Sequence, residues 1–199
     1  MDDEPDRTEA LKRRIRAEVR ARRRGMGERD RAAARDGLTR QLIGLVEAHG
    51  ARSLTCYASI PGEPDTSAFL AWAAERGIEV LLPVTRPGGA MDWVRAGGGF
   101  SEGPFGIPQP LGEPADPARL ARLDLVLAPA CAVDRSGTRL GWGGGYFDRF
   151  LAGLAHRPPV HALVHEAEFV AELPRETHDV PVAGVVTPER AVRIPRGTP

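Results

Sequence analysis

Apolar residues recur along this chain in two patterns, one typical of helices and one typical of buried strands. Leu11, Ile15 and Val19 repeat every four residues and predict a helix over residues 8–24. Leu123–Ala128 is a continuous apolar run, as expected for a strand that is buried on both faces. The same reading predicts further strands over 53–58, 78–83, 160–164 and 182–186 and further helices over 28–48, 66–76 and 146–155.

The alternation of strands and helices predicts the fold class. We expect a three-layer α/β/α arrangement with a largely parallel central sheet, similar to a Rossmann fold. At 199 residues, the chain is expected to form one domain over residues 1–199, with residues 1–6 as a disordered tail. Ligands of such sheets bind beyond the carboxyl ends of the strands, where the loops 59–66, 129–145 and 165–179 should meet.

The sequence also predicts a hairpin, a helix cap and an irregular segment. Met91–Arg95 is expected to pair as one arm of a hairpin. Thr66 is a candidate N-cap for the helix that follows it, and Gly77 stands just past the end of that helix. Residues 96–117 are rich in glycine and proline and are expected to be irregular.

Composition and charge exclude several classes of function. The 27 basic and 27 acidic residues balance, so no overall field favours nucleic acid. No run of about 18 apolar residues is present, and the acidic first residues do not resemble a secretory signal. Cys56 and Cys131 lie in apolar runs and are expected to be buried thiols, with a disulfide or metal role as the less favoured alternative. We therefore expect a cytoplasmic protein that binds neither nucleic acid nor membranes.

The most informative segment is the glycine-rich run Arg139-Leu-Gly-Trp-Gly-Gly-Gly-Tyr-Phe-Asp-Arg-Phe-Leu151. Glycine permits a positive φ angle, so consecutive amide groups can converge on one anion. The run leads into a predicted helix, whose first N–H groups and dipole favour phosphate. Arg139 could add a two-pronged donor, and Asp148 could hold Mg²⁺ against the phosphate. The segment therefore predicts a phosphate site.

Three other interpretations of the glycine run were considered. A dinucleotide fingerprint needs glycine where this chain has Tyr146, so it does not fit. A P-loop needs lysine after its last glycine, and the only lysine in the chain is Lys12. A flexible linker remains the commonest use of such a run, but the apolar flanks Leu140 and Tyr146-Phe147 argue against a solvated linker.

The glycine run resembles the signature of the 5-formyltetrahydrofolate cyclo-ligase (methenyltetrahydrofolate synthetase) family from Arg139 to Arg149, with Phe147 in place of a common tyrosine. Other matching segments occur in the family's order: Lys12-Arg-Arg-Ile-Arg16, Pro61-Gly-Glu63-Pro-Asp-Thr66, Gly106-Ile-Pro-Gln-Pro110, Pro129-Ala-Cys-Ala-Val-Asp134 and His178-Asp179-Val-Pro-Val182. The resemblance therefore covers nearly the whole chain and is more specific than the glycine run alone.

The resemblance implies a ligase that converts 5-formyltetrahydrofolate into 5,10-methenyltetrahydrofolate and splits ATP into ADP and phosphate, with Mg²⁺ as cofactor. Its partners would be the small-molecule substrates, and we expect the protein to be a monomer. Two alternatives stay open. One is a catalytically inactive relative that binds folate or nucleic acid, and the other is a different enzyme on a similar scaffold.

The resemblance also assigns site residues. The catalytic residues would be Arg139 and Tyr146, and the ATP-binding residues Lys12, Arg16, Arg139, Leu140, Gly141, Trp142, Gly143, Gly144, Gly145, Tyr146 and Phe147. The folate would contact Ala58, Glu63, Trp142, Gly143, Gly144, Gly145 and Tyr146, and the metal ion would bind Asp148 and Asp179. Trp93, Phe105 and Trp142 are candidates for an aromatic wall or for the core.

Each of these assignments has an ordinary structural alternative. Lys12 and Arg16 stand four residues apart on one helix face and can reach the same anion. The remaining basic residues of this helix are expected to form a solvated face: Arg13, Arg14, Arg20, Arg22, Arg23 and Arg24. Asp148 could be a first-turn helix acid, and Asp179 a turn former. Glu63 could be an exposed turn residue, and His161, His165 and His178 lack a metal-ligand spacing.

Overall fold

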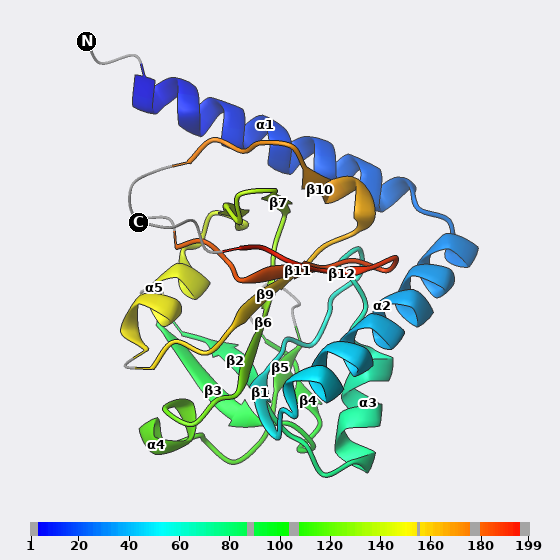
Figure 1. The fold of residues 1–199 in the computed structure, drawn as a ribbon, viewed down its shortest axis with the longest axis vertical. Helices are drawn as coiled ribbons and strands as arrows, with labels where there is room; N and C mark the ends of the chain where they lie inside the picture. Colours follow the sequence, from blue (N-terminus) through cyan, green and yellow to red (C-terminus); the bar gives the residue numbers. More distant parts are fainter. Residues whose placement is uncertain (1–3, 87–89, 104–107, 155, 176–179, 196–199) are drawn as a thin grey trace.

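A seven-stranded sheet forms the centre of the computed structural model, which describes residues 4–86, 90–103, 108–154, 156–175 and 180–195 (Figure 1). The strand order is β12-β11-β9-β6-β1-β2-β3. The strands are β1 (Ser53–Thr55), β2 (Glu79–Thr85), β3 (Met91–Arg95), β6 (Leu125–Pro129), β9 (Val160–Leu163), β11 (Gly184–Val186) and β12 (Ala191–Arg193). All pair in parallel except the edge strands β3 and β12. The predicted largely parallel sheet is confirmed.

The strand order locates the place where a ligand can bind. Numbered along the chain, the parallel strands β1, β2, β6, β9 and β11 lie in the order 2-1-3-4-5. This is the flavodoxin-like order of doubly wound sheets, so the expected similarity to a Rossmann fold holds for the layers and not for the strand order. The chain turns in opposite directions from β1 and β6, and a crevice therefore opens between their carboxyl ends.

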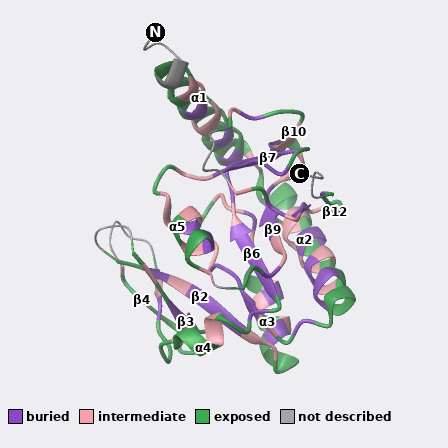
Figure 2. Ribbon diagram, turned by 60° about the vertical axis from the view of Figure 1, so that its left-hand side comes forward, coloured by how far each residue is buried: buried purple, intermediate pink, exposed green. Residues whose placement is uncertain are grey.

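Helices cover both faces of this sheet and give the predicted three layers. On one face, α2 (Glu28–His49) and α3 (Ser67–Glu75) pack Leu38, Leu42 and Phe69 against the buried strands. On the other face lie α4 (Pro117–Leu120) and α5 (Tyr146–Gly153), and α5 packs Phe147 and Leu151 over β6. Figure 2 shows that the strands between these helices are largely buried.

A second sheet, which the apolar pattern did not predict, extends from the carboxyl ends of β6 and β9. Its order is β10-β7-β8, and its strands are β7 (Ala132–Asp134), β8 (Arg139–Leu140) and β10 (Phe169–Val170). The carboxylate of Asp134 holds the β7–β8 turn, because its Oδ1 accepts from the amides of Ser136 at 2.8 Å and Thr138 at 3.0 Å. The long helix α1 (Glu4–Gly25) packs Val19 and Ile15 against this small sheet (Figure 1).

Three local predictions need correction. Helix α1 begins at Glu4, so residues 4–6 belong to a helix and not to a disordered tail. Part of the segment 96–117 is ordered, because β4 (Phe100–Ser101) pairs with β5 (Gln109–Pro110). Thr66 precedes α3 as predicted, but its buried hydroxyl donates to the Tyr57 carbonyl at 2.6 Å instead of capping the helix.

The two cysteines are buried free thiols, as the sequence predicts. Burial raises the pKa of Cys56 to about 12 and that of Cys131 to about 11, so neither thiol forms a reactive thiolate near neutral pH. Within the described ranges, no helix combines the length and the apolar character needed to cross a bilayer.

Candidate active site

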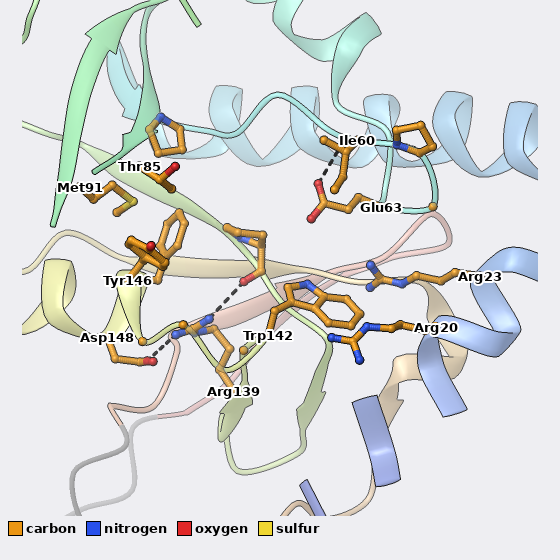
Figure 3. A pocket seen from close by; sticks show the side chains of 18 of the residues that line it. Arg20, Arg23, Ile60, Glu63, Thr85, Met91, Arg139, Trp142, Tyr146 and Asp148 are labelled. Atoms are coloured by element: carbon orange, nitrogen blue, oxygen red, sulfur yellow. Dashed lines mark hydrogen bonds and ion pairs between the residues drawn. The ribbon is translucent and has the colours of Figure 1, made fainter. Parts of the chain in front are cut away.

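A pocket of about 550 Å³ opens where the predicted crevice lies (Figure 3). Ile60–Glu63 follow β1, Pro83 and Thr85 end β2, and Pro129 ends β6, and all of them line the pocket. The glycine loop before α5 forms much of the remaining wall. The expected meeting of the loops 59–66 and 129–145 is therefore confirmed. No described residue of the third loop, 165–175, lines this pocket, and residues 176–179 lie outside the described residues.

The glycine loop presents unused amide donors to this pocket. Gly143 has a φ of 98° and Gly145 a φ of 64°, conformations that side chains rarely adopt. The Gly141 carbonyl accepts from Arg16 Nε at 3.0 Å, and the Gly144 carbonyl accepts from an Arg149 Nη at 2.7 Å. Among the described residues, no hydrogen bond uses the amide groups of 141–145. The loop thus has its carbonyls turned to arginines and its N–H groups available to an anion.

Arg139 lies buried in the wall of the pocket. One of its terminal nitrogens donates to the Pro129 carbonyl at 3.2 Å, and the other pairs with the Asp148 carboxylate. Its guanidinium carbon is 5.9 Å from the centre of the Phe147 ring. Its Nε is buried and has no hydrogen-bond partner within the described chain. The side chain is therefore fixed in orientation and still has one donor unsatisfied.

Glu63 faces the pocket from the wall across from Arg139 (Figure 3). Its Oε2 accepts from the amide of Ile60 at 3.1 Å. Burial raises the pKa of Glu63, although the hydrogen bond from Ile60 and the charge of Arg23 act in the opposite direction. A hydrogen-bond donor on a ligand would therefore stabilise the charged form of this carboxyl group.

Aromatic residues divide between the pocket and the core. Trp142 and Tyr146 line the pocket, and Figure 3 shows Tyr146 beside Thr85 and Met91. Trp93 does not line it, because its ring is buried in the core against Phe147 at 6.0 Å and against the neighbouring Phe150. Of the candidates for an aromatic wall, Trp142 is therefore supported and Trp93 is a core residue.

Helix α1 contributes cations in a way that differs from the prediction. Arg20, Arg23 and Arg24 line the pocket, whereas Lys12 and Arg16 do not. Arg16 contacts the back of the glycine loop through Gly141 and also pairs with Glu9 at 3.0 Å. The assignment of Arg23 to a solvated face is wrong, because Arg23 is buried and paired with Glu168. Its partner is 145 residues away, so no local pattern could indicate the pairing.

Other predicted site residues have different positions. Leu140 packs in the core beneath α1, and Ala58 and Gly143 do not line the pocket. Phe105, His178 and Asp179 lie outside the described residues. The sequence reading missed Ile60, Pro83, Thr85, Met91 and Pro129 as lining residues. Most of these follow or end predicted strands, so the rule that ligands bind beyond strand ends could have found them.

A divalent cation fits the pocket only together with a ligand. Among the described residues, no group of three His, Cys, Asp or Glu side chains forms a metal cluster. Asp148 lines the pocket with its side chain 40% exposed. Mg²⁺ is usually held by one or two carboxylates, by waters and by substrate phosphates, and a single accessible carboxylate matches that donor set.

Fold and pocket together define a doubly wound α/β protein with a glycine-rich loop at its switch point. The model of the 5-formyltetrahydrofolate cyclo-ligase family matches residues 8–188, and the chain belongs to this family. The 5-formyltetrahydrofolate cyclo-ligase of Mycolicibacterium smegmatis is 38% identical over 71% of this chain and 76% of that protein. The Escherichia coli K12 enzyme of the same name is 32% identical over 70% of this chain and 80% of its own length.

Solved structures give the same result. The 5,10-methenyltetrahydrofolate synthetase of Aquifex aeolicus superposes with a TM-score of 0.79 at 27% identity and covers 95% of each chain. The 5,10-methenyltetrahydrofolate synthetase of Mycoplasma pneumoniae superposes with a TM-score of 0.72 over 89% of this chain and 99% of that one. Its sequence identity is 16%, so this structure supports the fold alone. The family consists of ATP-dependent ligases that act on small-molecule substrates.

Proposed function

We propose that this protein closes 5-formyltetrahydrofolate to 5,10-methenyltetrahydrofolate in an ATP-dependent reaction that releases ADP and phosphate. The observation that carries the proposal is the pairing of two features in one pocket. A glycine loop with available N–H groups forms one side, and Glu63 faces the pocket from the other. An anion and a nitrogen-rich ring can therefore bind next to each other.

The chemistry explains why ATP is needed. An N-formyl group resembles an amide, so its carbon is a poor electrophile and its oxygen is a poor leaving group. Transfer of the γ-phosphoryl group to the formyl oxygen forms a new P–O bond, breaks the bond to ADP and makes that oxygen a good leaving group. N10 then attacks the formyl carbon, phosphate leaves with its bonding electrons, and the N10 proton passes to solvent.

Phosphoryl transfer depends mainly on positioning and on neutralising charge. We assign the ATP phosphates to the amides of the glycine loop from Gly141 to Gly145, to Arg139 and to the α1 pair Lys12 and Arg16. The unsatisfied Nε of Arg139 supports this assignment, because a buried donor gains from an incoming acceptor. Arg16 already contacts the loop at Gly141, so a small rearrangement would bring its charge to a bound phosphate.

We assign the folate to the side of the pocket formed by the loop after β1. The Glu63 carboxylate would accept from N–H groups of the pterin ring, and Tyr146 and Trp142 offer flat surfaces for stacking. Ala58 lies just before this loop and is assigned to the same substrate. Tyr146 also lies next to the glycine loop, where its hydroxyl could donate to the reacting oxygen.

Mg²⁺ is the cofactor that fits an ATP-dependent reaction in this pocket. We assign it to Asp148, with Asp179 as a second carboxylate. When bound, the ion would neutralise charge on the phosphates. Arg139 holds the Asp148 side chain at the pocket wall before any ligand binds. We also propose that the protein acts as a monomer in the cytoplasm.

The test is a direct assay with purified protein, Mg-ATP and 5-formyltetrahydrofolate. We expect the near-ultraviolet absorption of the methenyl product to appear in step with ADP, and no product when ATP is omitted. Binding of both ligands without product would favour the inactive relative. Failure to bind either ligand would refute the assignment of this pocket.

A further inference from the structure

Arg23, which lines the pocket, forms a buried ion pair with Glu168. Arg23 Nε and an Arg23 Nη each donate to one Glu168 carboxylate oxygen at 2.7 Å, and the same Nη donates to the Ala130 carbonyl at 3.0 Å. The side chains are 5% and 0% exposed. Glu168 ends the short 3₁₀ helix η3 (Glu166–Glu168), and its Oε2 also accepts from the His165 amide at 2.8 Å. The pair therefore joins α1 to two loops that follow the central strands β6 and β9.

Stability alone does not explain this pair. Removing two charges from water costs several kcal/mol, and buried pairs can often be replaced by apolar side chains without loss of stability. Burial acts to lower the pKa of Arg23, but the hydrogen bonds and charge of Glu168 outweigh it and the pKa is raised. Arg23 thus stays charged, and a fork of two parallel hydrogen bonds fixes its orientation. Two directional hydrogen bonds restrict the orientation of the Arg23 side chain, whereas an apolar contact has no preferred direction.

The fixed guanidinium also contacts the glycine loop. Its central carbon lies 5.0 Å from the centre of the Trp142 ring, and that of Arg20 lies 5.1 Å from the same ring (Figure 3). About two turns earlier on α1, Arg16 Nε donates to the carbonyl of Gly141, the loop residue before Trp142. Helix α1 therefore meets the glycine loop at the consecutive residues Gly141 and Trp142, and among the described residues only the Arg23 contact is locked by a buried carboxylate.

Helix α1 has other contacts besides Arg23: an Arg22 Nη donates to the Ala167 carbonyl at 3.2 Å, and Lys12 is buried. Most described residues of α1 are exposed (Figure 2). The apolar contact of α1 with the small sheet is made mainly by Val19 and Ile15. An apolar contact of this size resists separation but permits small sliding or rotation of a helix. The position of α1 along its axis therefore depends on its polar contacts.

We infer that Arg23 and Glu168 act as a positioning pair, which sets the register of α1 against the glycine loop and so keeps Arg16 at Gly141, within a small rearrangement of the bound phosphates. Neither residue is assigned a contact with the reacting atoms. The inference rests on the proposed function, because it needs a phosphate-bearing ligand at the loop. A displacement of about 1 Å in a positioned group can cost up to about a hundredfold in rate.

The test compares two double variants that remove one ion pair each from α1. Arg23→Met with Glu168→Met removes the buried pair and keeps two side chains of similar volume. Arg14→Met with Glu18→Met removes the exposed pair on the same helix, whose closest N–O distance is 3.7 Å. We expect both proteins to be folded by circular dichroism. We expect kcat/KM for ATP to fall between about ten- and a hundredfold only in the first.

A single variant covers the case in which the first double variant does not fold. Arg23→Lys keeps a charge beside Glu168 but loses the fork and the flat contact with Trp142. We expect its kcat/KM for ATP to fall at least about tenfold. Wild-type kinetics in Arg23→Lys, or in a folded Arg23→Met, Glu168→Met protein, would overturn the inference.

A second readout needs no substrate and so separates this inference from the proposed function. Acrylamide quenching of Trp142 fluorescence can be isolated by subtracting the signal of a Trp142→Phe protein. We expect Trp142 to become more accessible in Arg23→Lys than in the wild type or the Arg14→Met, Glu18→Met control. Unchanged quenching in Arg23→Lys would show that the pair does not hold the loop, whether or not the enzyme assay succeeds.

Discussion

His161 in the middle of β9 is a buried histidine that no carboxylate among the described residues pairs with. The residue is 4% exposed, and its Nδ1 has no hydrogen-bond partner within the described residues. Its ring lies 5.5 Å from that of His49 and packs so closely on Gly184 that a methyl group there would come within 2.4 Å. Burial lowers the pKa of His161 to about 4, and the charges of His49 and Arg193 act in the same direction.

The sign of the effect on stability follows from this lowered pKa. In the unfolded chain the pKa of a histidine is near 6.5, so between about 4 and 6.5 the unfolded state binds more protons than the folded state. The contribution of neutral His161 to the free energy of unfolding is therefore fully present above pH 6.5 and is lost as the pH falls toward 4. At about 1.4 kcal/mol per pH unit, His161 should remove about 2 kcal/mol at pH 5 and about 3 kcal/mol near pH 4.

Urea unfolding at pH 7.5 and pH 5.0 measures this directly. Between the two pH values, the free energy of unfolding of His161→Leu should fall by about 2 kcal/mol less than that of the wild type, because the variant lacks the buried imidazole. The titrating carboxylates contribute equally to both proteins, so they do not affect this difference. His156→Leu, at an exposed position, is the matched control and should lose as much as the wild type. Equal losses in His161→Leu and the wild type would refute the reasoning, whatever the stability of the variant at pH 7.5.

Three further predictions concern packing and the assigned ligand contacts. Gly37→Ala should lower the free energy of unfolding in urea by roughly 1–3 kcal/mol, because its methyl group would lie 2.4 Å from the Pro188 carbonyl oxygen. On the same helix, the methyl group of Gly44→Ala would meet no atom within 4 Å, so this variant should raise the free energy of unfolding by about 0.5–1 kcal/mol. Destabilisation by both changes would contradict the packing. Glu63→Gln should raise the KM for the folate at least about tenfold and leave the KM for ATP unchanged, and equal effects on both would remove Glu63 from the folate side. Lys12→Ala should raise the KM for ATP or abolish turnover with the fold intact, whereas an unchanged response to ATP would remove Lys12 from the phosphate site.

The central strands could be predicted because a parallel strand is buried on both faces. Leu123–Ala128 therefore stands out as an apolar run, and β6 (Leu125–Pro129) falls within one or two residues of it. The small sheet could not be predicted in this way. β8 and β10 have two residues each, and their pairing with β7 depends on contacts between distant segments. Strands this short carry no periodicity of their own.

The site shows the same division. Glycines with a positive φ and an adjacent arginine are local features, so the loop with Gly143 and Gly145 could be predicted from the sequence. The burial of Arg23 could not, because in the sequence it is one of several arginines on an exposed helix. Only the fold brings the carboxylate of Glu168 to it. A run of basic residues therefore predicts an exposed helix surface, but it does not show which of those residues is buried in the fold.

The ion pair of Arg23 and Glu168 has a consequence for biosynthesis, because its members are 145 residues apart in the chain. A ribosome adds about 5–20 residues per second, so the first helix waits roughly 7–30 s for its acidic partner to be made. During that interval the nascent chain has a strongly basic first helix without its buried acidic partner and an incomplete pocket. The register of α1 against the glycine loop is thus fixed only after Glu168 has been made.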